Sequence, residues 1–513
     1  MEEPVALIEE EEDALDQHKY VGVGLFRFRF SLSSFRLGRG FSLRRFSIAE
    51  ASLLLMMAYI ASRILGVIRQ VIFNAVFGTG PAANAYYAAF RLPDTLFALI
   101  AGGALIQAFV PVFVSYEKQR SEAETWRLAS LVFNVMLVTL TALLLVAEFI
   151  APTFVTRFLV PGYSPSQQAL TISLTRIMLF QPLILGAGTV VTAILSSKRQ
   201  FLLPAISIAI YDVGLIGGLL VTLAIPRVGI YGPTFGVVVS AVLQVLVQIP
   251  GLLKQKIRYK FVWDLRDPGL HQVLRLLIPS AISVIILSIG FTIDTAFTSF
   301  LTDKASLAAL HNAQLFYNLP VALLSQAVAQ AALPRMSLLT TDGRYLHLRQ
   351  LTVKVVGAAV LLSVPTAIGL GVLGQPLIHL LFQHGAFTRH SSSLTYLALI
   401  GYLVGLPGHV AGDLLSRGFY ALKDARTPLF TNIFSLLVRT GLIIFLLKLF
   451  VGKSALIAIS LAASGAVTAE ALLLGYLLYV RLRAKIRQEK AAHMQAYQHD
   501  STAGQEEEKP SSY

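Results

Sequence analysis

Long runs of apolar residues, separated by short polar connections, fill the chain from about residue 48 to residue 480. A helix needs about 20 mostly apolar residues to cross a bilayer, and about twelve of these runs reach that length. We expect transmembrane helices over 48–77, 85–115, 125–152, 168–196, 201–225, 229–253, 272–301, 305–338, 346–373, 391–420, 428–448 and 455–480. The pattern therefore predicts an all-α polytopic membrane protein.

The chain also repeats itself. Three pairs of prolines recur in equivalent settings with offsets of about 223 to 225 residues: Pro111 with Pro334, Pro182 with Pro407, and Pro204 with Pro428. An even number of predicted spans separates the members of each pair, so the two halves should share one orientation in the membrane. We expect two pseudo-symmetric six-helix bundles around a central cavity, over 48–256 and 272–485, joined by a cytoplasmic linker at 257–271.

The charge of the chain is distributed as in a membrane protein. Hydrophobic residues make up 55% and charged residues 14%, and the formal net charge is +14. Most of the excess lies in alternate connections, which places both termini on the cytoplasmic side. We expect a basic and aromatic cytoplasmic tail over 1–47 and a second cytoplasmic tail over 486–513, both disordered.

Several classes of chemistry are excluded or unsupported. The chain has no cysteine, so disulfides and zinc–thiolate or iron–sulfur sites are impossible. No phosphate-binding G-x-x-x-x-G-K-[ST] loop is present, so ATP hydrolysis is not expected. No nucleophile is placed with a base, and no group of side chains has the spacing of a metal site. We therefore expect a transporter and not an enzyme, without a metal, a cofactor or a nucleic-acid partner.

Arginines lie inside several predicted spans. Arg63 and Arg69 fall in the first span and Arg91 in the second. A charge near the bilayer centre costs at least ~2.5 kcal/mol, so these residues indicate a polar cavity. The planar guanidinium donates two parallel hydrogen bonds to phosphate, which favours an anionic substrate. The alternatives are that Arg69 pairs with a neighbouring helix and that Arg91 forms a local ion pair with Asp94.

The C-terminal half carries its own buried charges. Asp294 lies in the seventh span, Arg439 in the eleventh and Glu470 in the twelfth, while His409 and Asp413 share the tenth. Because isolated charges are costly in a membrane, we expect Asp294 and Glu470 to pair with Arg439. Such a cluster is either a structural lock or a site for ion or proton coupling.

Four strings in the chain are specific enough to suggest a family. They are SRILGVIRQVIFNAVFGTGPAANAYYAAFRLPDTLFALIAGGALIQAFVPVF (62–113), AILSSKRQFLLPA (193–205), LFQHGAFT (381–388) and RGFYALKDARTP (417–428). Together they resemble the MurJ/MviN family of bacterial lipid II flippases, in the multidrug/oligosaccharidyl-lipid/polysaccharide exporter superfamily. The resemblance implies a protein of the bacterial cytoplasmic membrane. It would carry the undecaprenyl-pyrophosphate-linked peptidoglycan precursor across by alternating access, for cell-wall synthesis.

Matched by position, the resemblance assigns substrate contact to Arg63 and Arg69 and puts an acidic position of the family at Asn84. With Arg91, these form our candidate substrate-binding set. The chain also departs from the family, because the charged positions of the second and eighth spans fall at Phe97, Ala98, Gly102 and Leu315. The resemblance further implies an anionic lipid-linked substrate, membrane lipids and cell-wall synthases as partners.

The resemblance also implies sodium binding in the C-terminal bundle of some family members, through an acid on the seventh span and polar groups on the eleventh and twelfth, and Asp294 matches the acid. Here Arg439 occupies a polar position of that site and Glu470 falls near another, so a tethered guanidinium would replace the ion. We accordingly expect dependence on the membrane potential and not on sodium. Three alternatives stay open: export of another lipid-linked glycan, export of small drugs by cation antiport, and a paralogue that transports nothing.

Overall fold

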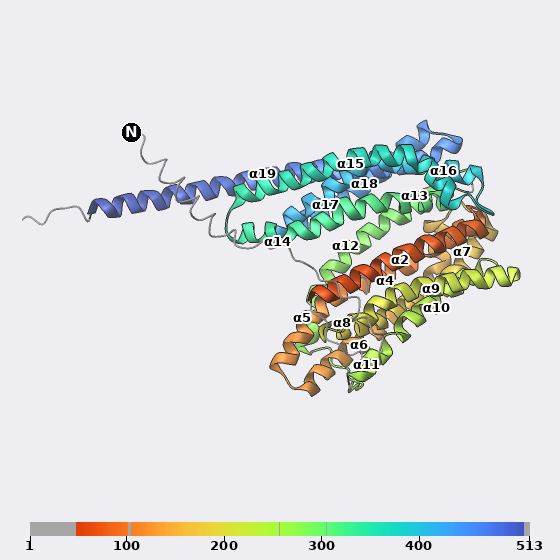
Figure 1. Cartoon of the computed structure of the whole chain (residues 1–513), viewed down its shortest axis with the longest axis horizontal. Helices are drawn as coiled ribbons and strands as arrows, with labels where there is room; N and C mark the ends of the chain where they lie inside the picture. The colour runs from red at the N-terminus through yellow and green to blue at the C-terminus, as the bar shows by residue number, and fades with distance from the viewer. Residues whose placement is uncertain (1–47, 101–103, 256, 304, 507–513) are drawn as a thin grey trace, which may run out of the picture. The chain divides into compact units, whose positions relative to one another are not determined.

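The computed structural model describes residues 48–506 apart from 101–103, 256 and 304, and its regular structure in these ranges is entirely helical (Figure 1). The first half contains α2 (Ile48–Phe77), α3 (Pro81–Ala89), α4 (Arg91–Ile100), α5 (Ala104–Gln119), α6 (Glu122–Phe154), the π-helix η3 (Val155–Leu159), α7 (Pro165–Met178), α8 (Phe180–Ser197), α9 (Leu202–Ala224), the 3₁₀ turn η4 (Pro226–Val228), α10 (Tyr231–Leu246) and α11 (Ile249–Lys254). The tail predicted over 1–47 lies outside the described residues.

The second half contains α12 (Pro268–Ser299), α13 (Ser306–Val321), the π-helix η5 (Ala322–Ala327), α14 (Val328–Thr341), α15 (Tyr345–Phe382), α16 (Arg389–Val404), α17 (Leu406–Ala421), α18 (Arg426–Leu449), the 3₁₀ turn η6 (Gly452–Ser454) and α19 (Ala455–Glu506). In the described ranges, eight helices are long and apolar enough to cross a membrane, or nine if the bent pair α16–α17 is one span. The other three predicted spans fall on α3 to α5, on α12 and on α13 to α14.

Prolines explain why several predicted spans appear as two helices. In three places a helix ends four residues before a proline, at Pro93, Pro182 and Pro250. A proline lacks the backbone N–H and its ring clashes with the carbonyl four residues earlier, so the helix breaks there. Pro407 follows the break between α16 and α17, where the axis bends by 48°.

The internal repeat is visible in the backbone. Arg199 and Lys423 have φ values of 57° and 59°, and they are the only described non-glycine residues with positive φ. The two stand at the same offset as the proline pairs, each in a basic loop before a helix that carries a proline in its first turn. Left-handed backbone is unfavourable for residues with a Cβ, so its recurrence indicates that both halves fold through the same turn.

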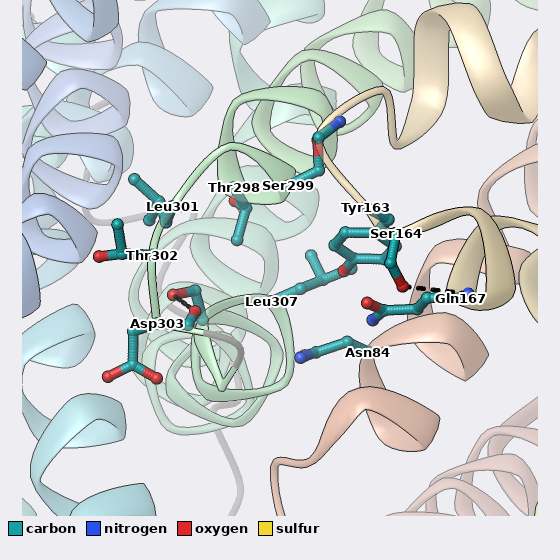
Figure 2. A pocket seen from close by; sticks show the side chains of 12 residues that line it. Asn84, Tyr163, Ser164, Gln167, Thr298, Ser299, Leu301, Thr302, Asp303 and Leu307 are labelled. Atoms are coloured by element: carbon teal, nitrogen blue, oxygen red, sulfur yellow. Dashed lines mark hydrogen bonds between the residues drawn. The ribbon is translucent and has the colours of Figure 1, made fainter.

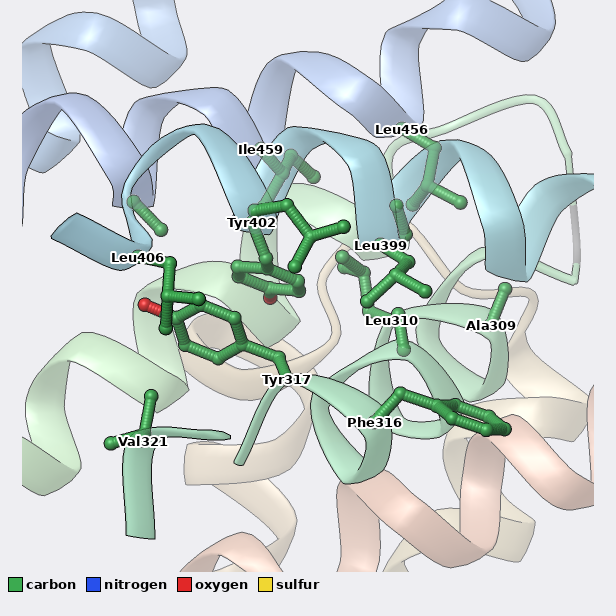
Figure 3. Packing of buried hydrophobic residues seen from close by; sticks show 14 of the residues in the cluster. Ala309, Leu310, Phe316, Tyr317, Val321, Leu399, Tyr402, Leu406, Leu456 and Ile459 are labelled. Atoms are coloured by element: carbon green, nitrogen blue, oxygen red, sulfur yellow. The ribbon is translucent and has the colours of Figure 1, made fainter. Parts of the chain in front are cut away.

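Small residues allow close helix packing within each half. On α9, Gly214 and Gly218 lie directly against α10, where a Cβ at Gly218 would overlap Gly232 and Gly236. In the second half, Gly401 of α16 and Gly408 of α17 lie in the same manner against Ser460 and Thr468 of α19. The apolar core there is built around α13 and α16 and includes Tyr317, Tyr402 and Leu406 (Figure 3). Such small-residue contacts are typical of membrane helices, whose association has little help from the hydrophobic effect.

Large apolar side chains cover the outside of the described part. Phe149 of α6 is 87% exposed and Leu361 of α15 is 75% exposed. Exposed apolar side chains of this size are unfavourable in water and suit contact with lipid acyl chains. They agree with the membrane assignment made from the sequence.

One prediction at the C-terminal end was wrong. We expected disorder from residue 486, but α19 continues as a helix to Glu506. Its last part is rich in Ala, Arg, Lys, Gln, Glu and Met, which are strong helix formers, and it has no proline. Low hydrophobicity of a segment says little about its local helix propensity, which is why the sequence pattern did not predict this helix.

Candidate functional site

A polar cavity of about 200 Å³ lies between α2, α3, α4, α9, α10 and α13. Its lining residues are Arg69, Gln70, Phe73, Tyr86, Tyr87, Phe90, Arg91, Asp94, Leu215, Leu219, Pro233 and His311. Only His311 comes from the second half, and its ring stacks on Tyr87 with centroids 4.1 Å apart. We call this space the arginine cavity. It combines two guanidinium groups, an imidazole, two tyrosine hydroxyls and one amide with the carboxylate of Asp94. The guanidinium groups and the other hydrogen-bond donors suit a phosphate-bearing ligand.

Arg69 reaches the arginine cavity from the middle of α2 and has an acidic partner. Its Nη1 lies 3.8 Å from Asp212 Oδ1 on α9, and the Arg69 and Asp212 side chains are 30% and 10% exposed. Ser62 Oγ donates a 2.5 Å hydrogen bond to the other carboxylate oxygen of Asp212. The sequence analysis missed Asp212, although it is the only acidic residue of α9 and therefore a detectable signal.

Arg63 does not line the arginine cavity. It lies on α2 six residues before Arg69, about 120° around the helix, and its side chain is exposed. Large apolar residues of the same helix, including Ile60 and Ile64, are exposed around it. The structure therefore separates the two arginines that the sequence grouped together. A role for Arg63 in substrate contact stays a prediction.

Arg91 does not form the local ion pair with Asp94 that the sequence suggested as an alternative, and it contacts α12 instead. Its Nε donates a 3.1 Å hydrogen bond to Thr295 Oγ1 on α12, and its guanidinium lies 5.4 Å from the centre of the Phe291 ring. Among the described residues there is no Arg91–Asp94 contact within ion-pair distance. The reason is that α4 packs against α12, which offers Arg91 a hydroxyl and an aromatic face at closer range.

A network of amide side chains joins the two halves beside the arginine cavity. Gln70 Nε2 donates to Asn312 Oδ1 at 2.9 Å and to the Tyr87 hydroxyl at 2.6 Å, and Asn74 Nδ2 donates to Asn312 Oδ1 at 3.0 Å. Gln70, Asn74 and Asn312 are buried, so these hydrogen bonds have no competition from water. The network holds α2 against α13.

Three further contacts close the same end of the molecule, which we call the closed end. The Ala386 N–H donates to the Ala75 carbonyl at 2.8 Å, and the Thr79 and Ser391 hydroxyls lie 2.7 Å apart. The Gly162 N–H donates to Ser299 Oγ at 3.0 Å. The closed end is thus built from loop residues 78–80, 160–164, 300–303 and 383–388.

Asn84 belongs to the closed end and not to the arginine cavity. Its Oδ1 accepts a 2.7 Å hydrogen bond from the Ala308 N–H on α13. It lines a second cavity of about 210 Å³, where Figure 2 shows Asn84 and Gln167 of the first half facing Asp303 and Leu307 of the second. The predicted substrate contact at Asn84 stays a prediction, and in this conformation the residue ties the halves together.

In the second half, the structure brings Asp294 of α12 and Arg439 of α18 together as an ion pair, with side chains 5% and 17% exposed. Glu470, expected to join them, does not pair with Arg439 in the described part of the chain. The Ser435 hydroxyl lies beside its carboxylate instead. The Asp294 carboxylate already neutralises the Arg439 guanidinium, so Glu470 would gain little stabilisation from pairing with it as well.

Comparison with known proteins identifies the family. A sequence model described as "Lipid II flippase MurJ" matches residues 73–499. The chain belongs to the MurJ family. The lipid II flippase MurJ of Burkholderia cenocepacia is 30% identical over 373 residues, which are 72% of each chain. A probable lipid II flippase MurJ of Rhizobium meliloti is 28% identical, over 80% of this chain and 76% of its own.

The comparison with solved structures agrees with this family assignment. A lipid II flippase MurJ in an inward closed conformation superposes with a TM-score of 0.71 at 26% identity, covering 83% of this chain and 87% of that one. An inward-facing MATE-family multidrug resistance transporter has a TM-score of 0.70 at 14% identity, covering 85% and 99% of the two chains. This second likeness shows the fold alone. The prediction of an all-α membrane protein with two helical bundles around a cavity is confirmed.

Leu315 of α13 occupies the position where the family resemblance predicts a charged residue in the eighth span. Leu315 packs against the apolar core of the second half and offers the arginine cavity no charge. One turn earlier on α13, His311 does line the cavity. The polar contribution of the second half to the cavity is therefore an imidazole, which the sequence analysis did not single out. The sequence feature that could have pointed to His311 is its position four residues before Leu315, which places both residues on one face of the helix.

Proposed function

We propose that this chain is a lipid II flippase, which carries the undecaprenyl-pyrophosphate-linked peptidoglycan precursor across the bacterial cytoplasmic membrane. The observation that carries the proposal is the arginine cavity, where Arg69, Arg91 and His311 converge from both halves of a MurJ-family chain. Guanidinium and imidazole groups donate hydrogen bonds that suit the oxygens of a pyrophosphate. The precursor is an anionic lipid-linked substrate, and membrane lipids would surround the protein during transport.

Transport by this chain would proceed by alternating access. The closed end blocks the cavity on one side through the Gln70–Asn312 and Asn84–Ala308 hydrogen bonds. Breaking these contacts and forming new ones at the opposite end would expose the cavity to the other side. If both termini are cytoplasmic, as the distribution of Lys and Arg predicts, the closed end faces outward. The substrate would then enter from the inner leaflet.

We further propose that the chain catalyses no covalent reaction and uses no cofactor, since translocation leaves the bonds of the substrate unchanged. Return of the cavity cations after substrate release would respond to the membrane potential, at about 2.3 kcal/mol per charge per 100 mV. The Asp294–Arg439 ion pair supports transport without sodium, because Arg439 already supplies a cation to Asp294. Cell-wall synthases, which consume the precursor outside, are further partners that this role suggests.

The test is growth of a bacterium whose own lipid II flippase has been shut off. We expect the chain to restore growth and Arg69→Ala to lower the number of surviving cells about tenfold or more, since a charged hydrogen bond is worth roughly 1.5–3 kcal/mol. Arg176→Ala is the matched control, because Arg176 of α7 is an exposed arginine 3.5 Å from Glu148. Arg63→Ala, scored in parallel, tests the second arginine of α2. Failure of well-inserted wild-type protein to restore growth would contradict the proposal.

A further inference from the structure

The segment that joins the two halves, residues 257–267 between α11 and α12, is held along the first turns of α6. It forms no helix, and we call it the linker strap. The Lys260 N–H donates a 3.2 Å hydrogen bond to Ser130 Oγ. Asn134 Nδ2 donates to the Val262 carbonyl at 3.0 Å, and the Tyr259 hydroxyl donates to Asn134 Oδ1 at 2.8 Å. The linker strap therefore has a defined course, which decides which of its side chains face outward.

Side chains of the linker strap alternate between contact with the first half and exposure. Val262 packs against the apolar core of the first half. Asp264 forms an ion pair with Arg127 of α6, with 2.9 Å between Oδ2 and Nη2. The odd-numbered neighbours of these residues are exposed: Phe261 by 75%, Trp263 by 48% and Leu265 by 53%. Such alternation is typical of extended backbone, in which successive side chains point to opposite sides. Three large apolar side chains thus project together away from α6.

The linker strap contacts α6 at the level where that helix enters the apolar part of a membrane. The span formed by α6 and η3 has 38 residues, or roughly 57 Å at 1.5 Å per residue, while the hydrocarbon core is about 30 Å thick. Charged residues occupy its first turns up to Arg127, and the next charged residue is Glu148. The contacts with the linker strap lie between Arg127 and Asn134, at the start of this uncharged run. Tryptophan is enriched at this boundary in membrane proteins.

The outward side of the linker strap is also cationic. Its two acids are occupied, since Asp264 pairs with Arg127 and Asp267 accepts from the Gly269 and Leu270 N–H groups at the start of α12. Three basic side chains are exposed and have no ion-pair partner in the described part of the chain: Arg258, Lys260 and Arg266. Basic residues next to large apolar ones complement an anionic lipid surface, where phosphates meet the charges and acyl chains meet the apolar groups.

We propose that the linker strap is a binding site for anionic membrane lipids at the cytoplasmic surface. Phe261, Trp263 and Leu265 enter the boundary between headgroups and acyl chains, and the basic side chains beside them bind the lipid phosphates. An acidic soluble protein would match only the charge. A lipid surface also matches the apolar side chains, which continue into exposed Leu253 of α11 and Leu276 of α12 on either side of the segment. The site shares no residue with the arginine cavity, and its ligand is a lipid of the surrounding membrane.

The fluorescence of Trp263 measures where the linker strap lies. The chain has two tryptophans, and the other one, Trp126, is 3% exposed and packs edge-on against Phe113. The variant Trp126→Phe therefore reports Trp263 alone, and Trp263→Phe reports the buried Trp126 as the matched control. If Trp126→Phe does not fold, the difference between the wild type and Trp263→Phe gives the same signal.

In liposomes, lipids brominated close to the headgroup should quench Trp263 about twofold more strongly than lipids brominated near the chain end, because the indole lies at the interface. Trp126 should be quenched weakly by both kinds of lipid. Quenching of Trp263 by acrylamide from the water phase, together with no quenching by either brominated lipid, would overturn the proposal and leave the segment free for a soluble partner.

Lipid selectivity tests the charges. Brominated phosphatidylglycerol in unbrominated phosphatidylcholine should quench Trp263 with about fivefold higher apparent affinity than brominated phosphatidylcholine in unbrominated phosphatidylglycerol. The triple variant Arg258→Gln/Lys260→Gln/Arg266→Gln should bring this ratio close to one. The control Arg335→Gln/Arg349→Gln/Lys354→Gln removes three exposed basic residues of the second half and should leave the ratio unchanged. Equal affinity for the two lipids in the parent protein, or selectivity that survives the first triple variant, would overturn the proposal. The readout needs no transported substrate, so its result is independent of the growth test.

Discussion

Gln70 of α2 and Asn312 of α13 form a 2.9 Å hydrogen bond between two buried side chains that come from opposite halves of the chain. Asn312 also accepts from Asn74, so one amide oxygen receives two donors from α2. Each of these groups would need a new partner if the halves separated here, because a buried polar group without a hydrogen bond costs ~1–3 kcal/mol. The network therefore stabilises closure at this end.

We predict that Asn312→Leu shifts the protein toward a conformation in which the two halves have separated at the closed end. Loss of both acceptor contacts leaves Gln70 and Asn74 without their partner on α13, and the cost of roughly 1–3 kcal/mol corresponds to a change of five-fold or more in the open-to-closed ratio. The distance between spin labels at Ser166→Cys on α7 and Ser393→Cys on α16, two exposed positions at the closed end, reports this ratio. Asn134→Leu is the control: Asn134 is equally buried but donates to the Val262 carbonyl, far from the closed end in sequence and contacts. Equal shifts in both variants would refute the assignment.

Gly78 and Gly385 should be the most sensitive glycines of the closed end. Both have positive φ, and a Cβ at either would overlap backbone of the other half, at Ala386 and Ala75 respectively. We predict that Gly78→Ala and Gly385→Ala prevent closure and abolish rescue of flippase-depleted cells. Gly229→Ala distinguishes backbone strain at positive φ from steric overlap between the halves. Gly229 has a φ of +53°, and nothing lies within 4 Å of its added Cβ. It should retain rescue, whereas its failure would attribute the effect to backbone strain alone.

Much of this fold could be predicted because the bilayer imposes simple rules. The apolar run at 48–77 became α2 with the same bounds, and prolines such as Pro182 mark the breaks inside other spans. Helix ends and breaks are local properties, fixed by hydrophobic length and by backbone hydrogen bonding. The repeat was also visible, because matched prolines keep their offset in both halves.

The partners of the buried charges could not be predicted in the same way. Arg69 pairs with Asp212, 143 residues away in sequence, and Arg91 reaches Thr295 and not the nearby Asp94. Spacing along a helix says which residues can meet on one face, while these contacts depend on which helices pack together. The pairing of Asp294 with Arg439 was easier to predict, because few charges lie deep inside the predicted spans of that half and a buried charge needs an opposite one.

For the Asp294–Arg439 pair we predict strong loss of stability when one member is removed. Arg439→Leu leaves a buried carboxylate without its cation and should cost roughly 3–5 kcal/mol, seen as a lower midpoint of thermal unfolding in detergent. The double variant Asp294→Leu/Arg439→Leu removes both charges and should recover most of the loss. Arg481→Ala, which breaks the more exposed pair with Asp424, should cost less. A double variant as unstable as the single one would show that the pair does more than neutralise charge.

The same pair predicts the ion dependence of transport. Arg439 lies against Asp294 and leaves a cation little reason to bind there. Flipping in liposomes should therefore proceed at the same rate when potassium replaces sodium. Arg439→Asn frees the carboxylate while keeping a polar side chain, and any sodium dependence should appear only in this variant. A wild-type rate that falls when sodium is withdrawn would contradict this account.

Asp424 predicts a pH dependence outside the membrane-spanning segments. Its carboxylate accepts from the N–H groups of Arg426 and Thr427 at the start of α18 and pairs with Arg481 of α19. Partial burial raises the pKa of Asp424, but the Thr427 hydrogen bonds and the Arg481 charge outweigh it, so the pKa lies below its usual value. A lowered pKa in the folded state means that the group stabilises the fold above its unfolded pKa, near 3.8, and that this contribution is lost as the pH falls through the folded value. Asp424→Asn should therefore lower the unfolding midpoint at neutral pH, and the difference from wild type should shrink below about pH 4. A difference that stays constant down to about pH 3 would mean that the carboxylate charge is not what holds α18 and α19 together at this end.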